Sequence, residues 1–513
     1  MTSTEAPANV VDALAIVVAA IGGSTRTGQM DMARAVNSAM MTGEHLLVEA
    51  GTGTGKSLGY LVPAILRASR GTESFKNRTV IATATLALQR QLIEQDLPRA
   101  LAALNPGFDR PITFAVLKGR ANYVCLEKFN RDATTAQEDG DQFLFDSPSS
   151  YLGKQAKKLR EWIKRTDTGD RDDFSEDLDG RLWRSVSVNG RECVGAAKCP
   201  YGDTCFAENA RRIAFDSDIV VTNHALLAID LVDGVPLLPD HNALVIDEAH
   251  ELVDRTTSAL AGSLDVRAVE RATGLVRKYI NTDTHGKLLD VADDLGAALN
   301  AVSVSNDVTR IEELPIGLHS TLTAVRDVAK VALNEITSSS QDDNEQLAAK
   351  TRAKAAMSEV SDVAADLLTV SDQTVRWLDT AREPTLHHAP LSVAHFLADS
   401  LFSDRSVVLT SATLEVAGSL EATARNVGID QAGGWTGLNV GSPFDYQRQG
   451  ILYCAAHLAR PDTSGISLET LDELGDLMDA AGGRTLSLFS SWRAVERAYE
   501  YLDARFRGRD NRP

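Results

Sequence analysis

The chain has few cysteines, few aromatic residues and no long apolar run. Cysteine accounts for 5 of the 513 residues, and phenylalanine, tryptophan and tyrosine together make up 5%. So few cysteines argue against a secreted scaffold held together by disulfides. No apolar stretch reaches the roughly 20 residues that are needed to cross a bilayer. We therefore expect a cytoplasmic protein with no membrane partner and no structural disulfide.

Positive charge is also scarce. The sequence has 52 Lys and Arg against 71 Asp and Glu, which gives a net charge of −19. A surface with this net charge does not attract nucleic acid as a whole, so any contact with phosphates must come from local basic grooves. Basic residues gather near the cysteines, together with aromatic residues that could stack on bases: Lys118, Arg120, Arg181, Arg184, Arg191, Lys198, Arg211, Arg212, Tyr123, Trp183 and Tyr201.

The order of the apolar segments predicts an α/β fold. A chain of 513 residues is too long for one core, so we expect several domains. Apolar strand patterns that alternate with helical patterns occur at 45–66, 79–95, 217–227, 242–250 and 405–414. Such alternation predicts a parallel sheet covered by helices on both faces. Two long segments interrupt it, at about 116–215 and about 266–385, and the second has the apolar spacing of helices.

The stretch AGTGTGKS, residues 50–57, follows a strand pattern and opens a helix, as a phosphate-binding loop does. Lys56 would reach the β- and γ-phosphates of ATP, and the Ser57 hydroxyl would hold Mg²⁺. The strict pattern has glycine where this chain has Ala50. The predicted ATP-binding residues of the loop are Gly51, Thr52, Gly53, Thr54, Gly55, Lys56 and Ser57. The alternative is a glycine-rich turn that only caps a helix.

Two adjacent acids end the apolar strand pattern ALVIDEAH, residues 243–250. Asp247 can hold the Mg²⁺ ion, and Glu248 can orient and deprotonate the attacking water. With Lys56, these two acids form the predicted catalytic set. His250 could link the nucleotide to a neighbouring element. Two acids at this position can also be no more than a helix cap.

Four of the five cysteines form a widely spaced set: Cys125, Cys193, Cys199 and Cys205. Four thiolates suit a tetrahedral zinc site and a [4Fe–4S] cluster equally in number. Zinc sites usually contain cysteine pairs two to four residues apart, and no such pair occurs here. The wide gaps favour the iron–sulfur cluster, while zinc and four unrelated core cysteines remain alternatives. Cys454 lies in an apolar run, so we expect a buried thiol there.

Several motifs carry a resemblance to a known family. EAGTGTGKS, DEAH and TSATL (410–414) occur in the order typical of the second helicase superfamily. With the four cysteines between the first motifs and DEAH, the chain resembles the iron–sulfur helicases related to XPD, and specifically the bacterial DinG branch. KGRANYVC (118–125), VVTNHALL (220–227) and GSPFDY (441–446) resemble that branch too.

The resemblance implies a fold and a set of domain boundaries. It implies a RecA-like parallel-sheet motor domain with inserted iron–sulfur and helical arch domains, plus the start of a second RecA-like domain. The expected first motor domain comprises 1–115, 216–265 and 386–425; the iron–sulfur domain is 116–215, the arch is 266–385, and the incomplete second motor domain is 426–513.

The resemblance also implies an activity. It implies 5′→3′ unwinding of DNA, with Mg²⁺ and ATP, in repair and on R-loops. Single-stranded and forked DNA are the expected partners of a monomer. Ser411 and Thr413 match the motif that couples hydrolysis to movement, together with His250. Gln29, upstream in RTGQMDM, matches the adenine-recognising glutamine, with Arg26 as a helper.

Two other functions remain open at this stage. One is a DNA-binding, redox-sensing module that keeps the cluster and the ATP site but does not unwind. The other is a zinc-stabilised P-loop ATPase that acts on something other than DNA. DNA-stimulated ATPase activity and strand displacement separate both from a helicase.

The end of the sequence gives one further expectation. RTLSLFSSWRAVERAYEYL (484–502) resembles the early strand and helix of a second motor domain. The later motifs of that domain are missing, and RGRDNR (507–512) is interpreted as a polar connector. Because arginine fingers contribute about 10³–10⁵ in turnover, we expect a truncated chain with feeble ATP hydrolysis and little unwinding.

Overall fold

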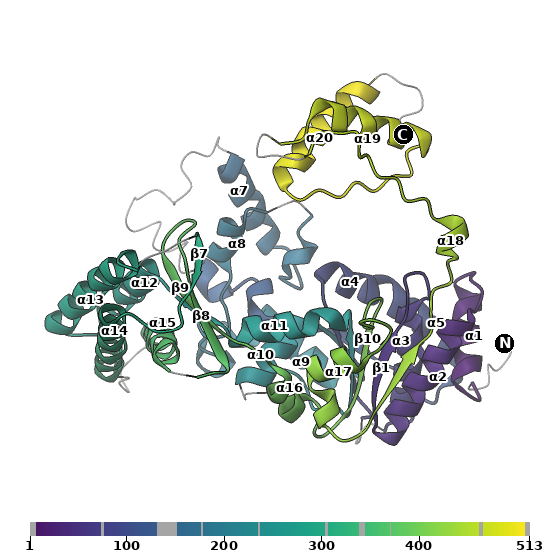
Figure 1. The fold of residues 1–513 in the computed structure, drawn as a ribbon. Coiled ribbons are helices and arrows are strands. Elements are labelled where there is room, and N and C mark those ends of the chain that lie inside the picture. Colours follow the sequence, from purple (N-terminus) through teal and green to yellow (C-terminus); the bar gives the residue numbers. More distant parts are fainter. Residues whose placement is uncertain are drawn as a thin grey trace. The chain divides into compact units, whose positions relative to one another are not determined.

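The computed structural model describes residues 7–72, 76–130, 151–175, 178–233, 236–302, 306–337, 344–369, 371–460 and 465–507. The chain divides into two compact units, residues 1–443 and residues 444–513. Figure 1 shows the central sheet, the inserted segments and the C-terminal helices. No helix of the described part is long and apolar enough to span a membrane.

The first unit is built on a seven-stranded sheet. Its strands are β1 (His45–Glu49), β2 (Thr79–Thr83), β3 (Phe114–Val116), β4 (Ile219–Asn223), β5 (Ala243–Asp247), β10 (Ser406–Ser411) and β11 (Trp435–Asn439). The order is β11-β1-β10-β5-β2-β4-β3, and every pair is parallel. The predicted RecA-like parallel sheet is therefore confirmed. Because the strands are parallel, the loops after β1, β5 and β10 lie at one edge.

Side chains alternate between two cores along each strand, as the period of two requires. In β2, Ile81 faces one core, and Val80 and Ala82 face the other. The first core packs against α1 (Val10–Ala20), α2 (Thr27–Thr42), α3 (Lys56–Ser69), the π-helical turn Leu92–Asp96 and α5 (Leu97–Leu104). The short helix α4 (Leu86–Gln91) precedes the π-helical turn. The second packs against α9 (Phe206–Asp216), α10 (His224–Asp233), α11 (Leu252–Leu260), α16 (Ala394–Leu401) and α17 (Glu421–Val427).

The first insertion lies between β3 and β4 and has a small core of its own. Its helices include α7 (Tyr151–Ile163) and α8 (Gly180–Val186). Val124, Leu159, Leu182 and Trp183 are among its buried residues. The cysteine segment 193–205 follows α8 and contains only short 3₁₀ turns, so backbone hydrogen bonding gives it little regular structure.

The second insertion contains more strand than the sequence indicated. Its helices are α12 (Val266–Val276), α13 (Thr282–Asn300), α14 (Ile316–Glu335) and α15 (Asn344–Leu368). They accompany an antiparallel sheet of β6 (Gly262–Leu264), β7 (Val308–Arg310), β8 (Thr374–Asp379) and β9 (Thr385–Pro390). The expectation of a helical segment missed these strands, because β6 and β7 are short and the burial along β8 and β9 does not alternate regularly.

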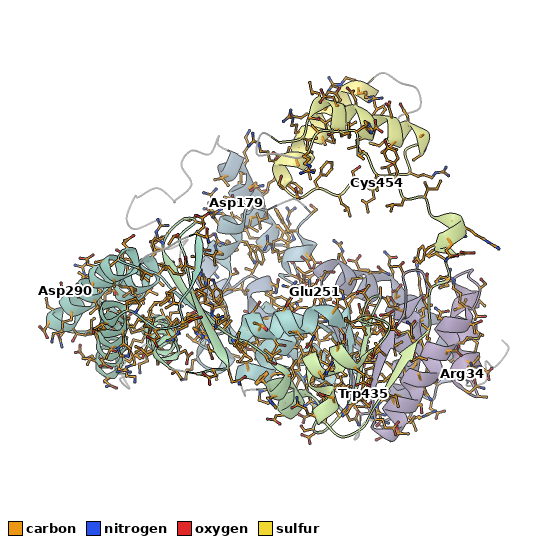
Figure 2. All side chains as sticks on the ribbon, in the orientation of Figure 1. Arg34, Asp179, Glu251, Asp290, Trp435 and Cys454 are labelled. Atoms are coloured by element: carbon orange, nitrogen blue, oxygen red, sulfur yellow. The ribbon has the colours of Figure 1, made fainter. Side chains whose placement is uncertain are left out.

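The second unit contains α18 (Tyr446–Gln449), α19 (Leu468–Ala480) and α20 (Trp492–Phe506). β11, which we had assigned to the second motor domain, pairs instead with β1 of the first sheet. The expected strand before α20 is absent among the described residues of this unit. Cys454, labelled in Figure 2, is exposed, so the expectation of a buried thiol was also wrong. Most of RGRDNR lies outside the described residues.

Candidate functional site

The predicted phosphate loop, residues 50–57, joins β1 to α3 at the carboxyl edge of the sheet. Gly53 and Gly55 have φ of 81° and 86°, a region that residues with a Cβ rarely adopt. Among the described non-glycine residues, only Glu248 and Ala417 have a positive φ, so the backbone at Ala50 does not require glycine. Ala50 is fully buried, and its N–H donates to the Ser411 carbonyl at 2.9 Å. Alanine therefore fits where the strict pattern has glycine.

At position 51, packing against the neighbouring segment requires a glycine. Its N–H donates to the Gly441 carbonyl at 3.0 Å, and an added Cβ would lie 2.9 Å from the Cβ of Ser442. Thr52, the next residue, is exposed on the loop. A larger side chain at position 51 would push the loop away from the segment that follows β11.

Gln29 and Thr54 support the loop from its buried side. Gln29 is 5% exposed, and its Nε2 donates to the Gly55 carbonyl at 3.0 Å. Arg26 donates to the Gly53 carbonyl. Thr54 is buried, and its hydroxyl donates to a loop carbonyl at 2.6 Å. The predicted adenine motif thus contacts the loop backbone directly.

The two predicted acids meet the loop at the end of β5. Glu248 Oε1 lies 2.9 Å from Lys56 Nζ. The Asp247 carboxylate accepts hydrogen bonds from the Tyr60 hydroxyl and from the Glu248 N–H, each at 2.9 Å. Glu248 has φ of 53°, a left-handed conformation that is unfavourable for glutamate. This turn directs the Glu248 carboxylate to Lys56 while Asp247 stays on the strand.

The carboxyl group of Asp247 is buried beside the charged side chains of Lys56 and Glu248. It is 4% exposed, and burial is the main cause that raises its pKa. Lys56 acts in the opposite direction and lowers this pKa, while Glu248 raises it. A buried carboxylate of this kind needs positive charge beside it. Lys56 supplies that charge, and a divalent cation could supply more.

Two of the predicted coupling residues, Ser411 and His250, lie at the second carboxylate oxygen of Glu248, Oε2. The Ser411 hydroxyl donates to Glu248 Oε2 at 3.2 Å and lies 2.8 Å from His250 Nδ1. His250 Nδ1 is itself 3.4 Å from Glu248 Oε2. The N–H of Thr413 donates to the Ser411 hydroxyl at 3.3 Å. Glu248 therefore connects the end of β5 to the end of β10.

Glu49, the last residue of β1, was not predicted. Its Oε2 accepts the N–H groups of Leu414 and Glu415, both at 2.6 Å, and its Oε1 accepts from Asn439 Nδ2 at 3.2 Å. It ties the strand that enters the phosphate loop to the segment after Thr413. The sequence feature that could have indicated this role is an acidic residue at the end of an otherwise apolar strand.

The four predicted cluster cysteines line one cavity of about 450 Å³, its open mouth included. All four thiols are free and half-buried. Burial raises the pKa of Cys125 to about 11 and also raises the pKa of Cys199, with smaller contributions from the neighbouring cysteines. Among the described residues, no three His, Cys, Asp or Glu side chains are grouped so as to hold one metal ion.

Several predicted DNA contacts around the cysteines are buried instead. Lys118 is 8% exposed and pairs with Asp170 at 2.6 Å. Tyr123 and Trp183 are each 3% exposed, so neither ring can stack on a base. These interpretations were wrong, because the insertion uses those side chains for its own core. Tyr201 is half-buried beside the cysteine cavity.

Comparisons with known proteins agree with these motifs. The DEAD/DEAH box helicase family matches residues 31–104. The ATP-dependent helicase DinG of Mycobacterium tuberculosis strain H37Rv is 42% identical over 513 residues, 97% of this chain and 76% of that protein. The ATP-dependent DNA helicase YoaA of Escherichia coli K12 is 31% identical, over 92% of this chain and 72% of that protein. A solved XPD helicase aligns with a TM-score of 0.47 and 14% identity, over 94% of this chain and 75% of that one.

Proposed function

Because this chain belongs to the DinG family of ATP-dependent helicases, we propose that it unwinds DNA with 5′→3′ polarity and acts on forks and R-loops in repair. Its substrates are single-stranded and forked DNA, and it works as a cytoplasmic monomer. The observation that carries the proposal is the junction at Glu248, where Lys56 and Ser411 contact opposite oxygens of one carboxylate. ATP hydrolysis and the movement of the segment after β10 can be linked there.

Lys56 and Glu248 change partners in the proposed cycle. In this structure Lys56 Nζ and Glu248 Oε1 pair at 2.9 Å. The γ-phosphate carries more negative charge than a carboxylate and competes for Lys56. Glu248 is then free to orient and deprotonate the attacking water. Mg²⁺, when bound, neutralises charge on the β- and γ-phosphates, and Ser57 and Asp247 are the residues that would hold it.

Hydrolysis is coupled to DNA through the segment after β10. When Glu248 turns toward the water, its contact with Ser411 changes, and His250 changes with it. Glu49 braces the next residues of the same segment through two backbone N–H groups. A change at Ser411 can therefore be passed along the residues after Thr413 to Glu49 and to the strand that enters the loop.

Cys125, Cys193, Cys199 and Cys205 hold a [4Fe–4S] cluster in this proposal. Their shared cavity and their freedom from disulfides support it. A single zinc ion holds its sulfur ligands at about 2.3 Å from one centre, which requires a closely grouped set. A cluster spreads its four thiolates over its corners. When bound, it cross-links a segment that has little regular structure of its own.

The test uses anaerobically purified protein of the full 513 residues. We expect feeble ATPase activity that rises with single-stranded DNA, and slow displacement of a strand from forks that carry a 5′ tail. A fork with only a 3′ tail and the Lys56→Ala variant are the controls. DNA-stimulated ATPase without strand displacement would favour a non-unwinding module, and colourless, zinc-containing, DNA-independent protein would favour a zinc-stabilised ATPase.

A further inference from the structure

Tyr60 occupies a position in α3 that the proposed mechanism has not used. It lies one turn after Lys56, so the two side chains leave the helix on the same face, toward β5. The side chain of Tyr60 is fully buried. Its hydroxyl donates to Asp247 Oδ2 at 2.9 Å. The phenol of Tyr60 therefore reaches a proposed Mg²⁺ residue from inside the protein.

The hydroxyl of Tyr60 stays a donor. An ionised carboxylate can only accept hydrogen bonds, so the phenol O–H is the donor in its contact with Asp247.

The carboxylate of Asp247 is fixed at both oxygens. Oδ2 accepts from Tyr60 and Oδ1 accepts from the Glu248 N–H, both at 2.9 Å. Two hydrogen bonds on two oxygens restrict rotation of the carboxylate about its χ2 angle, which is otherwise soft. Loss of the Tyr60 contact would leave one oxygen free to turn.

From this geometry we propose that Tyr60 is a positioning residue that holds the Asp247 carboxylate in the orientation needed to bind Mg²⁺–ATP. The inference rests on the proposed Mg²⁺ role of Asp247 and Ser57. Hydrogen-bond partners behind a metal-binding group typically contribute a factor of about 10–100 in metal affinity or activity. A phenylalanine at position 60 would fill the same volume and remove only that contact.

The experiment measures binding of a fluorescent ATP analogue to the full chain as Mg²⁺ is titrated. We expect Tyr60→Phe to raise the Mg²⁺ concentration at half-saturation about tenfold or more, while nucleotide binding in EDTA stays at the parent level. Thr256→Val is the matched control. It also removes one buried hydroxyl, which bonds to the Leu252 carbonyl at 2.9 Å in α11, away from the nucleotide. This control should leave the Mg²⁺ dependence unchanged.

A double-mutant cycle with Asp247→Asn shows whether Tyr60 acts through Asp247. If it does, Tyr60→Phe adds little in the Asp247→Asn background, because the group that it positions is already lost. The inference would be overturned if Tyr60→Phe left the Mg²⁺ concentration at half-saturation unchanged. It would also be overturned if Tyr60→Phe raised that concentration equally in the parent and in Asp247→Asn, even if the variant is less stable. If Asp247→Asn itself keeps the parent Mg²⁺ dependence, the proposed metal site fails instead.

Discussion

The carboxylate of Glu248 uses its two oxygens for different partners. Oε1 pairs with Lys56 of the phosphate loop, and Oε2 accepts from Ser411 at the end of β10. The backbone at this residue is left-handed, which costs about 1–3 kcal/mol for a residue with a Cβ. That cost is consistent with a conformation that the site needs and that local preference would avoid.

We expect Glu248→Gln to bind ATP and DNA but to hydrolyse ATP about 10²–10⁴-fold more slowly, because glutamine cannot accept the proton of the attacking water. Turnover and fluorescent-nucleotide binding, measured on the same preparation, separate the two effects. Lys56→Ala is the contrasting variant, since it should weaken nucleotide binding as well. Hydrolysis at the parent rate by Glu248→Gln would place the base on another residue.

A buried histidine, His224, and a half-buried one, His241, predict a loss of stability in acid. Burial is the main cause that lowers the pKa of His224 and of His241 from 6.5 to about 4. Between these values the unfolded chain binds more protons than the folded chain, so stability is full above pH 6.5 and falls as the pH drops toward 4. Each histidine should cost about 2 kcal/mol between pH 7.5 and pH 5.

Urea unfolding at the two pH values tests this expectation. His224→Gln can still donate to the Asp247 carbonyl, which His224 Nε2 contacts at 2.8 Å, but it cannot titrate. The variant should therefore lose about 2 kcal/mol less than the parent on acidification. Equal losses in the two proteins would mean that His224 is not responsible.

Single residues differed in how well the sequence predicted them. The meeting of Lys56 and Glu248 was predictable because each lies in a short motif with fixed spacing at the end of a strand. Tyr60 and Glu49 were not, because each acts on a partner that is remote in sequence and adjacent only in the folded sheet. Lys118 was misread because nothing in its own segment indicates the ion pair with Asp170.

At the scale of elements, α15 of the second insertion contacts the first insertion near its cysteines. Arg352 pairs with Glu127 at 3.1 Å, and these side chains are only 16% and 9% exposed. The side chains of Arg191 and Glu359 approach to 3.8 Å and are 62% and 59% exposed. Glu127 also lines the cysteine cavity. The two insertions are therefore linked beside the proposed cluster.

Arg352→Met should destabilise this link by about 3 kcal/mol, because it leaves the buried Glu127 carboxylate without its arginine. Hydrogen exchange should speed up in residues 120–130 and in α15. Arg191→Met is the matched control, and it should change stability by less than about 1 kcal/mol because exposed ion pairs contribute little. Equal effects of the two substitutions would show that burial of the pair does not matter.

Helices and strands were predictable where one face, or the whole element, is buried. Five strands of the parallel sheet, β1, β2, β4, β5 and β10, were found because each is an apolar run, whereas the three-residue β3 was missed. The strands β8 and β9 were missed because their intermediate burial gives no clear alternation. β11 was misplaced because its sequence, WTGLN, does not reveal that β1 is its neighbour.

At the scale of the whole chain, the nucleotide site and the cysteine cavity rest on different cores. The phosphate loop is supported by the two cores on the faces of the large sheet. The cysteine insertion has a separate cluster of buried residues, Val124 and Trp183 among them. Loss of order in one should therefore leave the other folded, and only an activity that needs both should fail.

Cys199→Ser tests that separation. We expect the variant to lose the cluster, to loosen part of 116–215 and to lose strand displacement, because the segment has little regular structure to replace the cross-link. Nucleotide binding through Lys56 should stay at the parent level, since the loop belongs to the sheet. Cys454→Ser, at an exposed thiol of the second unit, is the matched control and should keep iron and sulfide content unchanged. Normal unwinding by a colourless Cys199→Ser protein would remove the cluster from the mechanism.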